Sequence, residues 1–266
     1  MIFTDLETLF CEEKDEILVI NVNRPDKLNA LSVDVLNDLR TILIEIDRDF
    51  SYKYKGIILT GTGDKAFIAG ADIKAMDTMD AKQAEEFAQL GQEVTLLMEA
   101  CPIPIIACVN GFALGGGCEM AMACDFIYAT QNALFGQPEV NLGLIPGFGG
   151  TQRLMRYVGV ARSRELIYTG RNIKVDEAKE IGLVQEVFSN KEEMINAAME
   201  TFKAIKSKSP LIISKCKEVI RKGEGLEINK GLAIEKEGFR FVFTTEDKKE
   251  GVKAFLEKRK PQFQGK

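Results

Sequence analysis

Two glutamates stand in sequence surroundings that suit acid–base chemistry. Glu119 ends the glycine-rich string GGGCE (115–119), and Glu139 ends the string GQPE (136–139). Both lie in largely apolar sequence, where an ionised carboxylate without a partner is energetically costly. The glycines before Glu119 indicate a ligand that approaches the backbone closely. Two carboxylates beside preorganised backbone N–H groups are sufficient for catalysis by proton transfer.

The composition narrows the chemistry further. The sequence has no histidine, and none of its six cysteines forms a CxxC pair. This excludes Ser-His-Asp and Cys-His nucleophiles in their usual form, together with His-based zinc sites. No metal is therefore expected, and acid–base work falls to Glu, Asp, Lys, Tyr or Cys. The cysteines are interpreted as buried thiols in a reducing cytoplasm.

The glycine run before Glu119 also predicts a backbone donor. A strand is expected to end near Asn110, and a helix to begin near Gly116 or Gly117. The first N–H groups of a helix lack partners and lie at its positive end, so they can stabilise a thioester or ester oxygen that gains negative charge. Glu119 follows about one turn later on the same face. Close packing of helix on strand is the alternative that the glycines alone leave open.

Three other loops have compositions that bear on ligand contact. The string AGADIK (69–74) ends a strand at a glycine, so it can offer a second backbone donor, and Lys74 can meet a phosphate. The string PGFGGT (146–151) allows backbone close to a ligand or water near Glu139. An ordinary loop is the simpler interpretation of the first segment, and an exposed glutamate in a turn is the simpler interpretation of Glu139. The string GTG (61–63) lacks the third glycine of a dinucleotide site and is rejected.

The spacing of apolar residues predicts the elements that must position these groups. Short strands are expected at 16–23, 56–60, 66–69, 105–109 and 126–129, with helices at 32–49, 81–100 and 118–123 and a loop at 111–117. This rhythm favours an α/β fold of ββα units over a regular doubly wound sheet. Four further helices are predicted at 191–207, 210–222, 229–243 and 246–258. We therefore divide the chain into a core, 1–200, and a helical region, 201–266.

The net charge and the hydropathy of the chain limit the kinds of partner and the cellular location that are expected. The net charge of −5 argues against general binding of nucleic acid, although local lysines can still hold phosphates. The most apolar stretch, 102–129, contains four glycines and several polar residues, which a membrane span tolerates poorly. The acidic N-terminal segment lacks the basic region of a secretory signal. A cytoplasmic protein without a membrane segment is expected.

Several long strings resemble the enoyl-CoA hydratase (crotonase) family. They are RPDKLNAL (24–31), ADIKAM (71–76), NGFALGGGCEMAMACD (110–125), FGQPEVNLGLIPGFGGTQRL (135–154) and AFLEKRK (254–260). Within that family they are most similar to short-chain dehydratases of 3-hydroxybutyryl-CoA. The resemblance implies a crotonase-like spiral of ββα units with a C-terminal α-helical oligomerisation region. It also implies a homo-oligomer, a hexamer built as a dimer of trimers.

The resemblance assigns roles to particular residues. It implies no metal and no cofactor, because the acyl-CoA thioester is itself the substrate. Glu119 and Glu139 match the catalytic pair, and the N–H groups of Ala71 and Gly116 match the oxyanion hole. Further positions match residues that contact CoA or the reacting water: Asp72, Ile73, Lys74, Gly147, Phe239 and Lys258. The last two are expected to act across a subunit boundary.

The activity implied is reversible syn hydration of a short-chain trans-2-enoyl-CoA such as crotonyl-CoA, as in fatty-acid and butanoate metabolism. Glu119 is expected to activate the water and Glu139 to protonate Cα. Met76, Met79 and the helix at 81–100 are expected to line the acyl pocket. An enoyl-CoA isomerase and a non-catalytic acyl-CoA- or RNA-binding homologue are the alternatives. The paired glutamates argue against both, and the acidic net charge argues against RNA binding.

Overall fold

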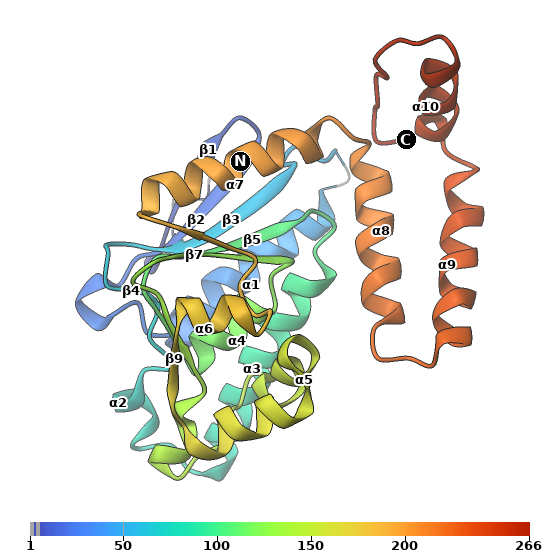
Figure 1. Cartoon of the computed structure of the whole chain (residues 1–266). Helices are drawn as coiled ribbons and strands as arrows, with labels where there is room; N and C mark the ends of the chain where they lie inside the picture. The colour runs from blue at the N-terminus through green and yellow to red at the C-terminus, as the bar shows by residue number, and fades with distance from the viewer. Residues whose placement is uncertain (1–2, 4–5, 50) are drawn as a thin grey trace.

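Two β-sheets form the centre of the structure. The computed structural model describes residues 3, 6–49 and 51–266 (Figure 1). The larger sheet has the order β1-β2-β3-β5-β7-β10, antiparallel at β1 and β2 and parallel beyond. Its strands are β1 (Leu9–Lys14), β2 (Ile17–Val22), β3 (Gly56–Gly61), β5 (Ile105–Val109), β7 (Phe126–Thr130) and β10 (Glu186–Phe188). The smaller sheet has the order β4 (Ala66–Ile68), β6 (Phe112–Leu114), β8 (Leu134–Gly136) and β9 (Asn172–Lys174).

Successive strand pairs contribute one strand to each sheet. β3 and β4, β5 and β6, and β7 and β8 each follow this pattern, and a helix comes after every pair. The predicted ββα rhythm is thus confirmed. The helices of this part are α1 (Val33–Arg48), α2 (Ile73–Met76), α3 (Ala81–Ala100), α4 (Gly116–Met122), α5 (Gly150–Thr169), α6 (Val175–Glu180) and α7 (Lys191–Lys206).

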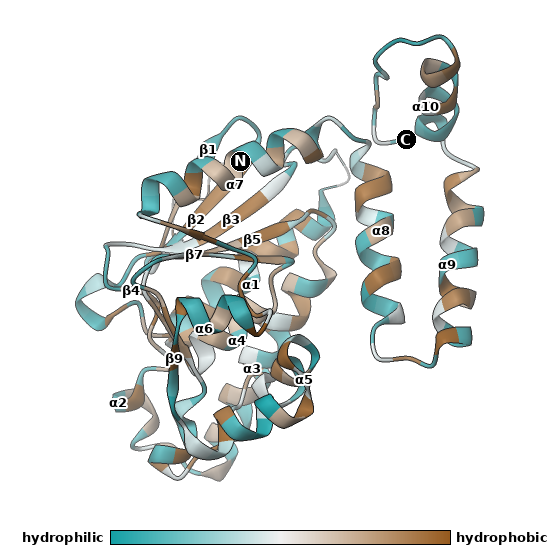
Figure 2. Cartoon of the chain, viewed as in Figure 1, coloured by the Kyte–Doolittle hydropathy of each residue, from teal (hydrophilic) through white to brown (hydrophobic). Residues whose placement is uncertain are grey.

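Side-chain caps explain where helices α1 and α3 begin, and burial shows where helix α4 lies. Ser32 caps α1 by accepting a hydrogen bond from the N–H of Val35, as its position before the apolar period predicts. Asp80 and Gln83 form a capping box at the start of α3. All seven residues of α4 are buried, so this short helix lies inside the core rather than on its surface. Figure 2 shows that the most hydrophobic segments lie in the central strands.

The segment 111–117 differs from the sequence prediction. It was predicted as a loop, but Phe112–Leu114 forms strand β6, which pairs with both β4 and β8. The helix begins at Gly116, as the glycine run predicted, and thus two residues before the span 118–123 that was expected from apolar spacing. A three-residue strand is too short for an alternating pattern, and its hydrogen bonds depend on neighbours distant in sequence.

Three C-terminal helices form an arm that stands apart from the sheets (Figure 1). These are α8 (Pro210–Gly223), α9 (Ile228–Val242) and α10 (Glu246–Leu256), close to the predicted spans. By contrast, α7 packs on the larger sheet, where Phe202 is fully buried. The boundary expected near 200 therefore falls inside α7. Within the described residues, no helix is both long and apolar enough to cross a membrane.

Candidate active site

A cavity of about 450 Å³ brings six of the predicted site residues together. It opens between α2, α3, the beginning of α4 and the loops that follow β4 and β8. Glu119 and Glu139 lie in its wall, as do Ala71, Gly116 and Gly147. Most of the other lining side chains are apolar. Such a cavity, with a few convergent polar groups, is typical of a small-molecule site.

Glu119 is held in place by two backbone N–H groups. Its side chain is buried, with 1% exposed. Oε1 accepts hydrogen bonds from the N–H of Phe148 at 2.9 Å and of Gly150 at 2.6 Å. Burial raises the pKa of Glu119 to about 7, and the nearby Glu139 adds to the rise, whereas the two backbone hydrogen bonds oppose it. A carboxyl with this pKa can give or take a proton near neutral pH.

Glu139 faces the start of α4 from the turn that follows β8. It lies in the 3₁₀ turn η2 (Pro138–Leu142), which begins with a proline. Its Oε2 is a buried oxygen without a hydrogen-bond partner among the described residues. A Cβ at Gly115 would lie 2.8 Å from Oε1 of Glu139, so glycine permits this approach. Burial also raises the pKa of Glu139.

Two backbone N–H groups are positioned beside the glutamates. Ala71 forms a parallel bridge with Leu31, in which the hydrogen bonds use Gly70 and Asp72 instead of Ala71 itself. The N–H of Ala71 therefore points away from Leu31. Gly116 is the first residue of α4, so its N–H has no acceptor within that helix. Because both residues line the cavity, this geometry suits the stabilisation of an oxyanion.

Side chains that the sequence analysis missed position the loop that holds Glu119. Nε2 of Gln92 donates to the carbonyl of Gly147 at 2.9 Å. Nη1 of Arg153 donates to the carbonyl of Phe148 at 2.8 Å, and Oγ1 of Thr95 lies 3.4 Å from the same oxygen. Gln92, which lines the cavity although it is exposed, and the buried Thr95 are three residues apart on α3. This spacing, i and i+3, places them as neighbours on the helix surface and was the signal available in the sequence.

Gln137 connects the two segments that carry the glutamates. It is 1% exposed, and its Nε2 donates to the carbonyl of Gly115 at 3.1 Å. Its Oε1 is buried without a hydrogen-bond partner among the described residues. A Cβ at Gly150 would lie 2.2 Å from that oxygen, so the glycine lets Gln137 lie beside the loop that holds Glu119.

The remaining predicted residues divide into those in the cavity and those outside it. Ile73 and Met76 line it, and α3 contributes Ala84, Phe87, Ala88 and Gln92; Met79 packs against the core instead. Asp72 is not in the lining but pairs with Arg24 at 3.0 Å, which holds its pKa below the usual range. Lys74 is exposed.

Two predicted contacts lie on the arm. Phe239 is 65% exposed on α9, and Lys258 is exposed just after α10. Neither lines the cavity of its own chain. In the described part of the chain, no three His, Cys, Asp or Glu side chains are arranged to hold a metal ion.

The fold and the cavity agree with the comparisons to known proteins. The chain belongs to the enoyl-CoA hydratase/isomerase family, whose sequence model matches residues 12–266. It is 45% identical to the short-chain-enoyl-CoA hydratase of Clostridium acetobutylicum, over 96% of this chain and 97% of the relative. It is also 45% identical to the crotonyl-CoA hydratase of Syntrophomonas wolfei, over 97% and 98%.

Solved structures give the same result for the fold. The crystal structure of an enoyl-CoA hydratase from Bacillus anthracis superposes with a TM-score of 0.93 at 39% identity. The match covers 98% of this chain and 100% of that one. The predicted crotonase-like fold and the family resemblance are therefore confirmed.

Proposed function

We propose that the protein catalyses the reversible syn hydration of short-chain trans-2-enoyl-CoA thioesters to 3-hydroxyacyl-CoA. The observation that carries this proposal is the pair Glu119 and Glu139, two carboxyls of raised pKa in the wall of one cavity. Relatives named short-chain-enoyl-CoA hydratase and crotonyl-CoA hydratase support the substrate class. The reaction needs only a base, an acid and an oxyanion site, and the cavity offers candidates for all three.

The mechanism starts from the thioester oxygen. It accepts hydrogen bonds from the N–H groups of Ala71 and Gly116, which withdraw electron density and make Cβ electrophilic. Glu119 removes a proton from a water molecule while the water oxygen bonds to Cβ. The resulting enolate takes a proton at Cα from Glu139. One proton has thus moved from water to Glu119 and one from Glu139 to carbon, and the two carboxyls then re-equilibrate as a coupled pair. Dehydration reverses these steps.

Substitution of each glutamate tests the assignment. Glu119→Gln and Glu139→Gln should each lower kcat by roughly 10²–10⁴-fold, the scale of general acid–base catalysis. The double variant should lose far less than the product, because one water serves both groups. The assay follows the loss of enoyl absorbance of crotonyl-CoA, with the exposed Glu180→Gln as the matched control. Near-wild-type hydration by either single variant would refute the role of that glutamate.

A comparison of two substrates with the wild-type protein separates hydration from isomerisation. The family also contains isomerases, which move a proton between carbons and add no water. Wild-type protein should hydrate crotonyl-CoA much faster than it converts a 3-enoyl-CoA into a 2-enoyl-CoA. The reverse ranking would assign the chain to the isomerases. A profile over four- to sixteen-carbon enoyl-CoA substrates would then measure the chain-length preference.

We also propose that the arm joins chains into a trimer-based oligomer, a hexamer made as a dimer of trimers. The arm exposes more large apolar side chains than an isolated surface helix normally does. These include Ile228, Leu232, Phe239, Phe255 and Leu256. Light scattering should report about six times the chain mass of 29.6 kDa. A fully active monomer at nanomolar concentration would contradict the proposal.

Lys258 provides a functional test of the assembly. Its side chain does not reach the cavity of its own chain, so a role in CoA binding requires a neighbouring subunit. Lys258→Ala should then raise KM more than it lowers kcat, because a CoA phosphate is remote from the reacting carbons. Lys260→Ala, two residues away on the exposed tail, is the control. A defect confined to kcat would place Lys258 in another role.

A further inference from the structure

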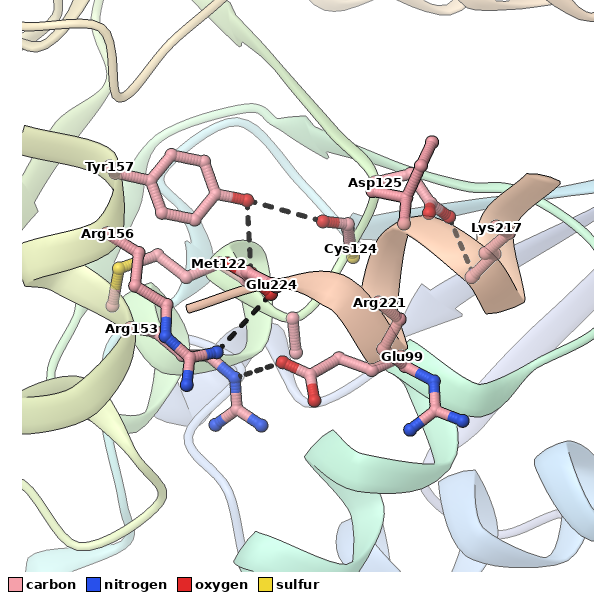
Figure 3. Close-up of a pocket in the computed structure, with 12 residues that line it drawn as sticks. Glu99, Met122, Cys124, Asp125, Arg153, Arg156, Tyr157, Lys217, Arg221 and Glu224 are labelled. Carbon is pink, nitrogen blue, oxygen red and sulfur yellow. Dashed lines mark hydrogen bonds and ion pairs between the residues drawn. The ribbon is translucent and has the colours of Figure 1, made fainter. Parts of the chain in front are cut away.

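A second cavity, of about 280 Å³, lies between the end of α4, helix α5 and the arm helix α8. Its lining shares no residue with the proposed substrate cavity. Figure 3 shows that charged side chains from several elements converge on it. The seven that carry the argument are Glu99, Asp125, Arg153, Arg156, Lys217, Arg221 and Glu224.

The charges of this second cavity are unbalanced around Arg221. Each of its three carboxylates already has a basic partner: Glu99 with Arg153 at 2.6 Å, Glu224 with Arg156 at 3.3 Å and Asp125 with Lys217 at 2.7 Å. Arg221 is the fourth basic residue of the lining. Its Nε is buried and has no hydrogen-bond partner among the described residues. One positive charge of the lining is therefore left over.

A buried guanidinium N–H without an acceptor is energetically unfavourable. A guanidinium has five donors in a planar fork, and this geometry matches a carboxylate or a phosphate. Lys217 has no such spare capacity, because it already donates to Asp125 and lies near the carbonyls of Met98 and Ile103. The donors left over in this cavity are those of arginine, so the missing group is an acceptor with negative charge.

We infer that this cavity is a binding site for a small oxyanion, a carboxylate or a phosphate, with Arg221 as its main ligand. A water molecule occupies about 30 Å³ of liquid volume, so the cavity has room for such an ion with several waters but not for a whole acyl-CoA. The bound ion lies against Arg221 of α8, in the cavity that this arm helix forms with α5.

The site lies behind the catalytic centre and does not open into the substrate cavity. Arg153 lines only the second cavity and is linked to the first through Phe148: Nη1 of Arg153 donates to the carbonyl of Phe148, and the N–H of Phe148 donates to Glu119. A ligand of the second cavity therefore does not compete with the thioester. Binding and turnover can be measured separately, and the test does not depend on the proposed activity.

The test is calorimetric titration of the assembled protein with inorganic phosphate and with acetate, at constant ionic strength set with chloride. We expect saturable binding of one ion per chain, and the tighter of the two ions identifies the ligand class. Arg221→Met should weaken this binding at least about tenfold, because a charge-assisted bidentate contact is lost. Lys222→Met, which removes an exposed charge from the next position of α8, should bind as the wild type does.

Further measurements separate loss of the ion site from misfolding and from loss of catalytic activity. Arg221→Lys keeps the charge but loses the planar fork, so it should fold and still bind more weakly than the wild type. Arg221→Met should retain wild-type kcat for crotonyl-CoA. Equal binding by the Arg221 and Lys222 variants would overturn the inference. The inference would also be overturned if the wild type bound neither phosphate nor acetate, or if titration with chloride gave the same binding. Displacement of the bound ion by CoA would overturn it too.

Discussion

The burial of Glu119 should reduce the stability of the folded protein at alkaline pH. Its pKa is raised from an ordinary 4.5 to about 7, mainly by burial. The folded state therefore favours the protonated carboxyl. For a carboxyl whose folded pKa is raised, the contribution to stability is complete below the unfolded pKa and is lost as pH rises through the folded pKa. Glu119→Gln removes this titration while keeping nearly the same shape.

The magnitude follows from the two pKa values. Between pH 5 and pH 8, linkage with pKa values of 4.5 and about 7 lowers the free energy of unfolding of the wild type by about 2.5 kcal/mol. The glutamine variant lacks this term. Its advantage over the wild type should thus grow by about 2.5 kcal/mol over the same pH range. Comparing two pH values cancels any constant packing difference between Glu and Gln.

Urea unfolding at pH 5 and pH 8, at one protein concentration, measures the effect. The concentration must be matched because assembly also stabilises the fold. Glu180→Gln, which changes an exposed glutamate at the end of α6, should run parallel to the wild type. If the wild type and Glu119→Gln also ran parallel, Glu119 would not be a carboxyl of raised pKa, and its proposed role as a base near neutral pH would lose its support.

Three further predictions concern activity and packing. Hydration kcat/KM should fall about tenfold per pH unit below the pKa of Glu119, about 7, because only the ionised carboxylate can activate water; a flat profile from pH 5 to pH 8 would contradict this. Gly91→Ala should destabilise the fold by about 1–3 kcal/mol in urea unfolding, because the new Cβ would lie 2.2 Å from the ring of Phe148. Gly231→Ala, whose Cβ meets no atom closer than 3.9 Å, should be neutral or stabilising. Dialysis against EDTA should leave kcat/KM unchanged, because the proposed steps use only carboxyls and backbone N–H groups; activity lost to EDTA and restored by a metal ion would overturn that mechanism.

Much of the helical architecture follows from the sequence because its signals are local. The spans of α3 and of the four C-terminal helices were predicted to within about two residues at each end, since apolar period, caps and proline act over a few neighbouring residues. The strand β6 was missed because its register depends on β4 and β8. The family strings identified Glu119 and Glu139, which the structure places in one cavity.

The tertiary structure decided how these residues are held. Phe148 and Gly150 lie 29 and 31 positions from Glu119, and Gln92 lies 55 positions from Gly147, so no local pattern could predict those hydrogen bonds. The same holds for Arg221, whose excess charge appears only when α8 is placed beside α5. The sequence by itself determined which residue types are available and which helices form. The pKa of Glu119 and the two separate cavities depend on burial and on contacts between distant segments, which only the folded chain brings together.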